Sequence, residues 1–479
     1  MTQEIKNPQS KIPELEPLLE KAKGYATAFR HGIEGRAPFP TATTQELRAP
    51  FNGALAKEGT PAGDVIDQLA AAADPGLMAV PSPNFFGWVM GSSHPVGVAA
   101  DWMASAWGQN CANEIVAPAG AIAEEVAGAW LLQALDLPAQ SSVGFVTGAT
   151  MANFVGLAAA RSEVLRRIGY DVEANGLFGA PKKVAVFIGE DAHATVFSAL
   201  QFLGIGSANV VKIPVDDNGA MRADVLREMV SACFNPKIIV AQAGQINTGA
   251  FDPFDEIAEI AAEHNAWVHV DGAFGLWARA SKDRAHLARG LDKADSWATD
   301  GHKWLQIPYD CGYVIVKDAE AHRRAMSIAA SYLPTSEDDR RDPADYVPEL
   351  SRRARGFATW AVLKHLGRDG IDQLVTRHCD LARHLRDRLD GVPGMEVLND
   401  VNLNQLAVGF GAGKALIEQN KLAKDMLTMM RDQNEFVLGG AEWHGRWIMR
   451  VSIISAPTRM RHIDALADAI IANWQQLNP

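Results

Sequence analysis

The middle of the chain alternates short runs of β-branched and aliphatic residues with helical patterns. The runs lie at 183–188, 210–215, 237–240, 267–270 and 311–317. Residues 255–263, between two of these runs, are apolar at helical spacing, with acidic residues on the opposite side. Because strands that alternate with helices are joined by right-handed crossovers, we expect an α/β fold. Its central sheet is expected to be mostly parallel, with helices on both faces.

The two flanks of this region follow different patterns. Residues 1–105 are interrupted by proline and show no series of strands, whereas the part after about residue 375 begins with a helical stretch and continues with strand runs. We therefore expect an N-terminal helical segment (1–105), a large α/β domain (106–375) and a small C-terminal α+β domain (376–479). The charged segment 334–349 contains three prolines. It is either a solvated connector or a mobile lid over a site.

Composition and charge exclude several classes of protein. The 45 basic and 57 acidic residues give a formal net charge of −12, and no basic stripe is present. This balance argues against binding to nucleic acid or to an anionic membrane surface. No segment has the apolar length of a membrane span or the pattern of a signal peptide. The four cysteines form no Cys-x-x-Cys pair and no metal motif is found, so we expect a cytoplasmic protein with reduced thiols and no metal.

Chemically distinctive residues follow several of the predicted strands. Asp271 ends one strand and is followed by the small Gly272 and Ala273, and Lys303 lies shortly after the next apolar run. His193 follows the strand run at 183–188, and residues 143–150 lead through glycine into a helical pattern. Because ligands of open α/β sheets bind at the carboxyl ends of the strands, we expect these features to meet in one pocket.

Each of these features has a use if the ligand is pyridoxal phosphate. Lys303 would form the Schiff base, and Asp271 would keep the pyridine nitrogen protonated. The turn from Gly148 to Met151 would offer a helix N-terminus to the phosphate. His193 would stack on the ring, and the small Ala273 would let the other face lie close. Taken singly, each residue has an ordinary structural explanation; together, in this order, they favour the cofactor.

The same residues carry a family resemblance. The chain resembles the group II pyridoxal-phosphate-dependent amino-acid decarboxylases, the family of aromatic-amino-acid, histidine and glutamate decarboxylases. The matching segments are Pro83-Asn-Phe-Phe86, Ala117-Pro-Ala119 with Glu124, Thr147-Gly-Ala-Thr-Met-Ala-Asn153, His193-Ala-Thr195, Gly249-Ala-Phe-Asp252, Trp267-Val-His-Val-Asp-Gly-Ala273, His302-Lys-Trp-Leu305 and Asp310-Cys-Gly312. The resemblance implies a fold type I, aminotransferase-like structure. It also implies a homodimer with its active sites at the interface and with the N-terminal segment packed on the partner.

The resemblance also implies roles for individual residues. Lys303 matches the Schiff-base lysine, Asp271 the partner of the pyridine nitrogen and His193 the ring-stacking histidine. Tyr332 matches the tyrosine of a mobile loop that protonates Cα after carbon dioxide leaves, although loop packing is an alternative role. The remaining positions expected around the cofactor are Ala149, Thr150, Met151, Ala273, Asp300 and His302.

Three positions depart from the family pattern. A threonine-rich stretch is replaced by 242–247, which contains Gln245, and a serine at the phosphate turn is replaced by Met151. Asp300 stands where the aromatic branch often has an asparagine. Since a carboxylate repels a phosphate dianion, Asp300 is expected to be turned away from the phosphate or held by another donor.

The predicted reaction is α-decarboxylation of an L-amino acid to an amine, with Tyr332 or His193 adding the proton at Cα. The side-chain pocket is expected to contain Phe86, Trp88 and His94, with Trp107 and Asn110 contributed across the dimer. These residues slightly favour an aromatic or bulky substrate. Two alternatives remain open: a decarboxylation in which oxygen intercepts the carbanion and an aldehyde forms, and a catalytically inert dimeric relative.

Overall fold

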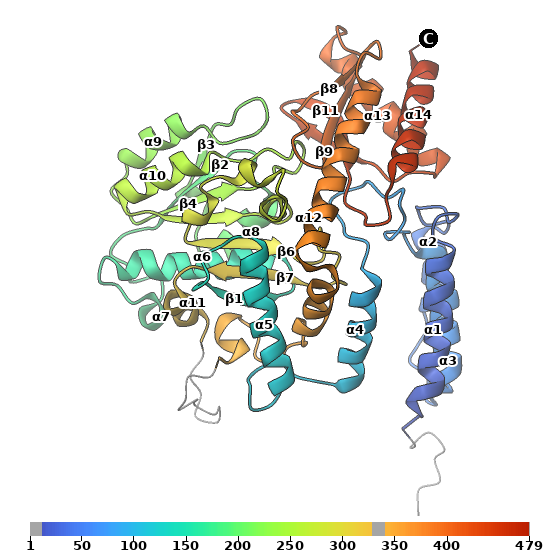
Figure 1. Cartoon of the computed structure of the whole chain (residues 1–479), viewed down its shortest axis with the longest axis horizontal. Coiled ribbons are helices and arrows are strands. Elements are labelled where there is room, and N and C mark those ends of the chain that lie inside the picture. The colour runs from blue at the N-terminus through green and yellow to red at the C-terminus, as the bar shows by residue number, and fades with distance from the viewer. Residues whose placement is uncertain (1–11, 328–340, 479) are drawn as a thin grey trace, which may run out of the picture.

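The computed structural model of the chain describes residues 12–327 and 341–478 (Figure 1). Its centre is a seven-stranded sheet with the order β1-β7-β6-β5-β4-β2-β3, in which β7 alone runs antiparallel to its neighbours. The strands are β1 (Ser142–Val146), β2 (Ala185–Gly189), β3 (Val210–Ile213), β4 (Lys237–Gln242), β5 (Trp267–Asp271), β6 (Ser296–Asp300) and β7 (Gly312–Val316). The predicted α/β fold class is confirmed.

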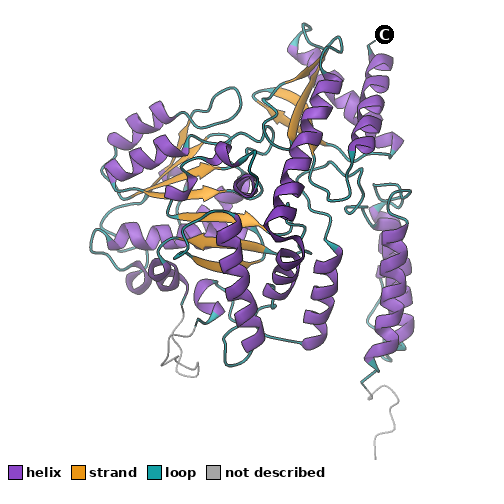
Figure 2. Cartoon of the chain, viewed as in Figure 1, coloured by secondary structure: helices purple, strands orange, loops and turns teal. Residues whose placement is uncertain are grey.

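Helices cover both faces of this sheet (Figure 2). They are α5 (Pro118–Ala134), α6 (Ala149–Arg166), α7 (Val172–Asn175), α8 (Ala194–Phe202), α9 (Ala223–Ser231), α10 (Phe254–His264) and α11 (Ala319–Met326). Alternate residues of one strand enter different apolar clusters: Ile239 packs with the α5, α9 and α10 side, and Ile238 with the α6 and α8 side. This two-sided burial explains the continuous apolar runs in the sequence, because a covered parallel strand has no solvent face.

A second, antiparallel sheet lies in the C-terminal part, with the order β10-β11-β9-β8. Its elements are β8 (Met395–Val397), β9 (Gln405–Phe410), α13 (Leu416–Gln433), β10 (Gly439–Trp443), β11 (Arg446–Ser452) and α14 (Met460–Leu477). The long helix α12 (Gly356–Leu389) connects the two sheets and is kinked at Gly367, where φ is 60°. The predicted boundary at residues 375–376 lies inside this helix.

The N-terminal part consists of α1 (Leu15–His31), α2 (Thr44–Phe51), α3 (Ala62–Ala73) and α4 (Pro95–Trp107). Helices α1 and α3 lie side by side, away from the large sheet (Figure 1). Short 3-10 helices lie at Asp74–Gly76, Ser207–Asn209, Gly275–Ala280, Ala285–Ala288, Leu291–Lys293 and Pro343–Tyr346. Within residues 12–327 and 341–478, no helix combines the length and the apolar composition needed to cross a membrane.

Candidate active site

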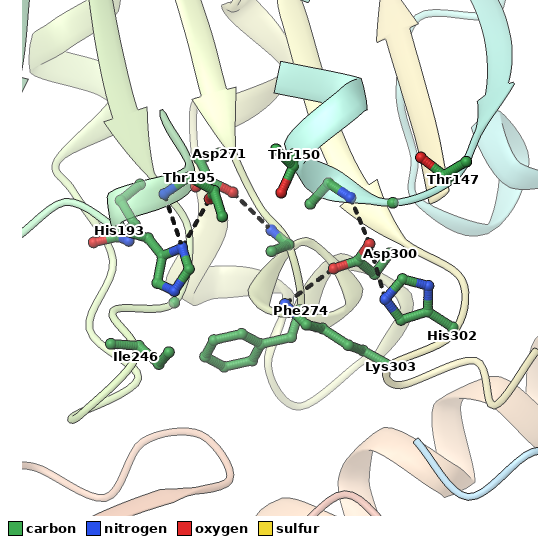
Figure 3. A pocket seen from close by; sticks show the side chains of 15 residues that line it. Thr147, Thr150, His193, Thr195, Ile246, Asp271, Phe274, Asp300, His302 and Lys303 are labelled. Carbon is green, nitrogen blue, oxygen red and sulfur yellow. Dashed lines mark hydrogen bonds and ion pairs between the residues drawn. The ribbon is translucent and has the colours of Figure 1, made fainter. Parts of the chain in front are cut away.

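A cavity of about 310 Å³ lies at the carboxyl ends of β4, β5 and β6, beside the N-termini of α6 and α8 (Figure 3). It is lined by Thr147, Gly148, Ala149, Thr150, His193, Thr195, Gln242, Gly244, Ile246, Asp271, Ala273, Phe274, Asp300, His302 and Lys303. The strand ends meet here because parallel strands present their carboxyl ends at one edge of the sheet.

Asp271 is the last residue of β5, and its side chain is buried at the inner end of the cavity. Among the described residues, its carboxylate accepts one hydrogen bond, from the Ala273 N–H at 3.2 Å. Burial raises the pKa of Asp271, and the nearby His193 and Lys303 oppose part of that rise. A buried carboxylate with so few donors suits a protonated ring nitrogen, which supplies both a hydrogen bond and a positive charge.

Lys303 lies in the turn that follows β6, and its amine points into the cavity toward Asp300 (Figure 3). The Nζ atom lies 2.9 Å from Asp300 Oδ2. The other oxygen of this carboxylate accepts a hydrogen bond from the Ala149 N–H at 2.6 Å and lies 3.3 Å from His302 Nε2. Asp300 is therefore held by other donors, which is one of the two arrangements expected from the sequence.

His193 is the N-cap residue of α8, and its ring borders the cavity. The Nδ1 atom lies 2.7 Å from Thr195 Oγ1, and this contact fixes the orientation of the ring. Burial lowers the pKa of His193 and keeps the ring neutral near neutral pH. Figure 3 shows Ile246 and Phe274 bordering the same cavity, so this wall is largely apolar and aromatic.

The turn before α6 provides backbone N–H groups at the opposite end of the cavity. Gly148 is the N-cap residue, and the first N–H groups of a helix have no partners within the helix. The turn is tightly packed: a Cβ atom placed on Gly312 would lie 2.5 Å from Gly148 Cα. The Asp271 carboxylate, the Lys303 amine and these N–H groups together form a set of polar partners that fits pyridoxal phosphate.

The structure brings most of the predicted cofactor residues together. Ala149, Thr150, His193, Asp271, Ala273, Asp300, His302 and Lys303 all line the cavity. Met151 does not line it, because its side chain packs against the apolar cluster around α6 and α8. Gln245 is also absent from the lining; its side-chain oxygen accepts hydrogen bonds from the Asn247 and Thr248 N–H groups instead. Tyr332 lies outside the described residues.

The residues expected to form the substrate pocket do not line the cavity within this single chain. Phe86 is a core residue of the C-terminal sheet, where its ring centroid lies 6.4 Å from that of Phe436. Trp88 lies in a separate surface groove together with Trp447. Phe86 belongs to that core because the chain there runs along the C-terminal sheet, with the Phe86 N–H bonded to the Val437 carbonyl.

The other three residues of this set also have local roles. His94 is the N-cap residue of α4, and its ring lies 5.0 Å from that of His365. Trp107 and Asn110 belong to none of the apolar clusters. The Trp107 ring contacts Phe357 edge-on, and the Asn110 side-chain oxygen accepts a hydrogen bond from the Arg352 N–H. Their predicted contribution across a dimer stays a prediction.

Sequence reasoning missed four residues at or beside the cavity. Three of them, Gly244, Ile246 and Phe274, line the cavity. The first two lie in the stretch 242–247, and Phe274 directly follows the family motif that ends at Ala273. Arg450 lies beside the cavity on β11: this buried guanidinium donates from Nη2 to the Ile246 carbonyl at 2.7 Å. Its signal in the sequence is a charge between the apolar residues Met449 and Val451.

Comparison with known proteins agrees with this geometry. The family model of the pyridoxal-dependent decarboxylase conserved domain matches residues 45–410. The chain is 26% identical to tryptophan decarboxylase 1 of Oryza sativa subsp. japonica over 470 residues, which cover 93% of this chain and 90% of the relative. It is also 26% identical to the aromatic-L-amino-acid decarboxylase of Mus musculus over 455 residues, which cover 92% and 93%.

Solved structures share the fold. The structure of Oryza sativa TDC with PLP and tryptamine superposes with a TM-score of 0.90 at 22% identity, and the match covers 100% of both chains. That of Rhodiola rosea 4-hydroxyphenylacetaldehyde synthase superposes with a TM-score of 0.88 at 21% identity, and the match covers 97% of this chain and 99% of the other. At these identities the similarity establishes the fold.

Proposed function

The chain belongs to the family of pyridoxal-dependent decarboxylases, and from this premise we propose that its cavity removes the α-carboxylate of an aromatic L-amino acid. The chain is a pyridoxal-phosphate-dependent carboxy-lyase that acts on an amino acid. The observation that carries the proposal is the convergence of Lys303, Asp271 and His193 on one cavity at the edge of the large sheet.

When bound, pyridoxal phosphate would supply an electron sink for the electron pair of the Cα–carboxylate bond, so that carbon dioxide can leave and a proton can be added at Cα. We assign Lys303 to covalent attachment, since it is the one lysine among the described lining residues. Asp271 would keep the ring nitrogen of the bound cofactor protonated, because its buried carboxylate is stabilised by a cationic partner.

We assign His193 to one face of the ring and Arg450 to the substrate's α-carboxylate. Among the described residues, no carboxylate lies within ion-pair distance of Arg450, and its buried Nε atom has no hydrogen-bond partner. Burial lowers the pKa of Arg450 to about 10, so the guanidinium remains charged at neutral pH. A charged, incompletely paired guanidinium beside the cavity, bonded to the lining residue Ile246, is suited to orient a carboxylate.

The proton added at Cα comes from Tyr332 or His193. His193 is placed at the cavity, whereas Tyr332 is proposed from the sequence pattern alone. The variants Tyr332→Phe and His193→Gln separate the two residues, since within a single turnover loss of the proton donor delays amine formation relative to carbon dioxide release.

The aromatic side chain of the substrate is proposed on two grounds. Ile246, Phe274 and the His193 ring give the cavity an apolar wall, against which an aromatic group packs favourably. The relatives that match most of this chain include two tryptophan decarboxylases and several aromatic-L-amino-acid decarboxylases.

We further propose that the enzyme is a homodimer. Helix α1 contains no buried residue. Large apolar side chains are exposed on α1, α3, α4, the segment between α4 and α5, and the start of α5, namely Leu15, Leu19, Val65, Leu69, Trp102, Met103, Trp107, Ile115, Val116 and Ile122. A second copy of the chain would cover such a surface. Light scattering after size exclusion tests this proposal, which a mass of one chain would contradict.

A cytoplasmic location is proposed from the thiols. All four cysteines are unpaired, and three of them are buried. Unpaired buried thiols suit a reducing compartment. Fractionation of the native host with an activity assay checks this proposal.

The experiment that tests the activity measures carbon dioxide and products together. Purified protein loaded with pyridoxal phosphate is given a panel of aromatic, aliphatic, acidic and basic L-amino acids. We expect carbon dioxide and the matching amine in equal amounts from an aromatic member. Aldehyde with hydrogen peroxide in place of amine would indicate oxidative decarboxylation. Release only from acidic or aliphatic members would overturn the proposed substrate class.

A further inference from the structure

The carboxylate of Asp300 lies at the helix N-terminus where the phosphate of the cofactor is expected. Its side chain is 3% exposed. Oδ1 accepts the Ala149 N–H at 2.6 Å, the first N–H group of α6, and Oδ2 lies 2.9 Å from Lys303 Nζ. His302 Nε2 lies 3.3 Å from Oδ1. One side chain therefore contacts both the anion-binding turn and the lysine of the cavity.

Asp300 and a phosphate group have competing requirements. Negative charge at a helix N-terminus is favourable, and Asp300 already gains that interaction. A phosphate oxygen that accepted the Ala149 N–H would have to take the place of Asp300 Oδ1, and the two anions would repel each other at that distance. The turn offers little room for both, since a Cβ atom on Gly148 would lie 3.2 Å from Asp300 Oδ1.

The same carboxylate also holds the amine of Lys303. Its amine must leave Asp300 before it can bond to a carbonyl carbon, because the nitrogen is held against that carboxylate at 2.9 Å. Movement of the Asp300 carboxylate away from α6 therefore changes the surroundings of the phosphate turn and of the lysine in a single step.

We propose that Asp300 is an internal competitor for the phosphate of the cofactor: its carboxylate occupies the N-terminus of α6 in the cofactor-free enzyme, and the phosphate binds there by displacing it. This rests on the proposed placement of pyridoxal phosphate in the cavity. The competition weakens retention of the cofactor, so this enzyme exchanges pyridoxal phosphate with its surroundings more readily than the same enzyme with a neutral residue at position 300.

The test compares cofactor-free wild type with two variants that each lose one carboxylate. Asp300→Asn keeps the shape and a side-chain oxygen for the Ala149 N–H, but removes the charge. Asp310→Asn is the matched control, since this residue lies in the same connection between β6 and β7 but pairs with Arg355 and is 46% exposed. The ligands are pyridoxal phosphate, pyridoxal without phosphate, and inorganic phosphate, each measured by calorimetry and by tryptophan fluorescence.

Asp300→Asn is expected to bind pyridoxal phosphate and inorganic phosphate at least tenfold more tightly than wild type. The gain for pyridoxal should be clearly smaller, and Asp310→Asn should leave all three affinities within twofold. Equal or weaker binding of the two phosphates by Asp300→Asn overturns the proposal, and so does an equal gain for pyridoxal, which would place the whole effect at Lys303.

Two further measurements keep the test decisive. If Asp300→Asn fails to fold, Asp300→Ala is used, with the same expected gain in phosphate affinity. If wild type and both variants bind pyridoxal phosphate no better than a protein without this cavity, the proposed function itself fails. That result differs from a failure of the Asp300 proposal, in which wild type still binds the cofactor.

Discussion

The carboxamide of Gln306 joins three distant segments next to Lys303. This residue is fully buried and has a left-handed backbone, with φ of 62°. Its oxygen accepts from the Ser92 N–H at 2.7 Å and from Ser92 Oγ at 2.6 Å. Its nitrogen donates to the carbonyls of Lys303 at 2.9 Å, Trp304 at 3.1 Å and Ile454 at 2.8 Å.

The substitution Gln306→Leu keeps the approximate volume but removes every one of these hydrogen bonds. The Ser92 N–H then lacks its acceptor, and the Lys303 and Ile454 carbonyls lose this donor. At about 1–3 kcal/mol for each of these three buried groups, the free energy of unfolding should fall by roughly 3–9 kcal/mol. This loss is a large part of the stability of an ordinary domain, about 5–15 kcal/mol. The Lys303 turn also loosens, so kcat/KM should fall by about 100-fold.

Urea unfolding followed by tryptophan fluorescence measures the loss of stability. Gln419→Leu is the control, because this glutamine makes one exposed hydrogen bond, to the Lys414 carbonyl at 2.8 Å. It should stay within about 0.5 kcal/mol of wild type. A loss below about 1 kcal/mol in Gln306→Leu would refute the reasoning, since the carboxamide would then not tie the three segments together.

Three further predictions concern the cavity and its supports. Lys303→Ala should abolish carbon dioxide release while the protein keeps the circular dichroism spectrum and the oligomeric mass of wild type. Lys282 is exposed, so the control Lys282→Ala should keep full activity. Turnover by Lys303→Ala would contradict the assignment of Lys303. Arg450→Met should raise KM at least tenfold, with partial recovery in Arg450→Lys, as measured by initial rates; an unchanged KM contradicts the assigned role. Burial raises the pKa of Asp252 to about 7, so the stability contributed by its protonated form is present below about pH 4 and is lost as the pH rises toward 7. Urea unfolding should show wild type losing about 3 kcal/mol relative to Asp252→Asn between pH 5 and 8, and a constant difference would contradict this.

The part of the site that the sequence predicts consists of residues that directly follow a predicted strand. Asp271 and His193 follow apolar runs. Because the carboxyl ends of parallel strands lie at one edge of a sheet, the two residues are predicted to lie close together even when no other contact is known. The same rule places the 148–151 turn, because a glycine precedes a helical pattern. These predictions needed only the direction of each strand.

The parts that could not be predicted depend on contacts between segments far apart in the chain. Nothing local to Phe86 indicates that its partner is Phe436 in the C-terminal sheet, and its position near the family motifs suggested the cavity instead. Asp300 bonds to a backbone N–H group 151 positions away. Arg450 reaches Ile246 across 204 positions. In each case the three-dimensional packing, and not the residue type, decides the role.

The long helix α12 determines how this chain can be divided. Its first half packs on α4 and α5, and its second half packs on α14 and on strands of the C-terminal sheet. A fragment that ended near residue 375 would cut the helix and leave Leu374 and Val375 at a frayed end. The remaining fragment would begin with Cys379, Ala382 and Leu385, which are buried in the whole chain and would then be exposed. We therefore expect such fragments to aggregate when made separately. A division that keeps α12 whole, with the C-terminal sheet attached to it, preserves the surfaces on which that sheet is assembled.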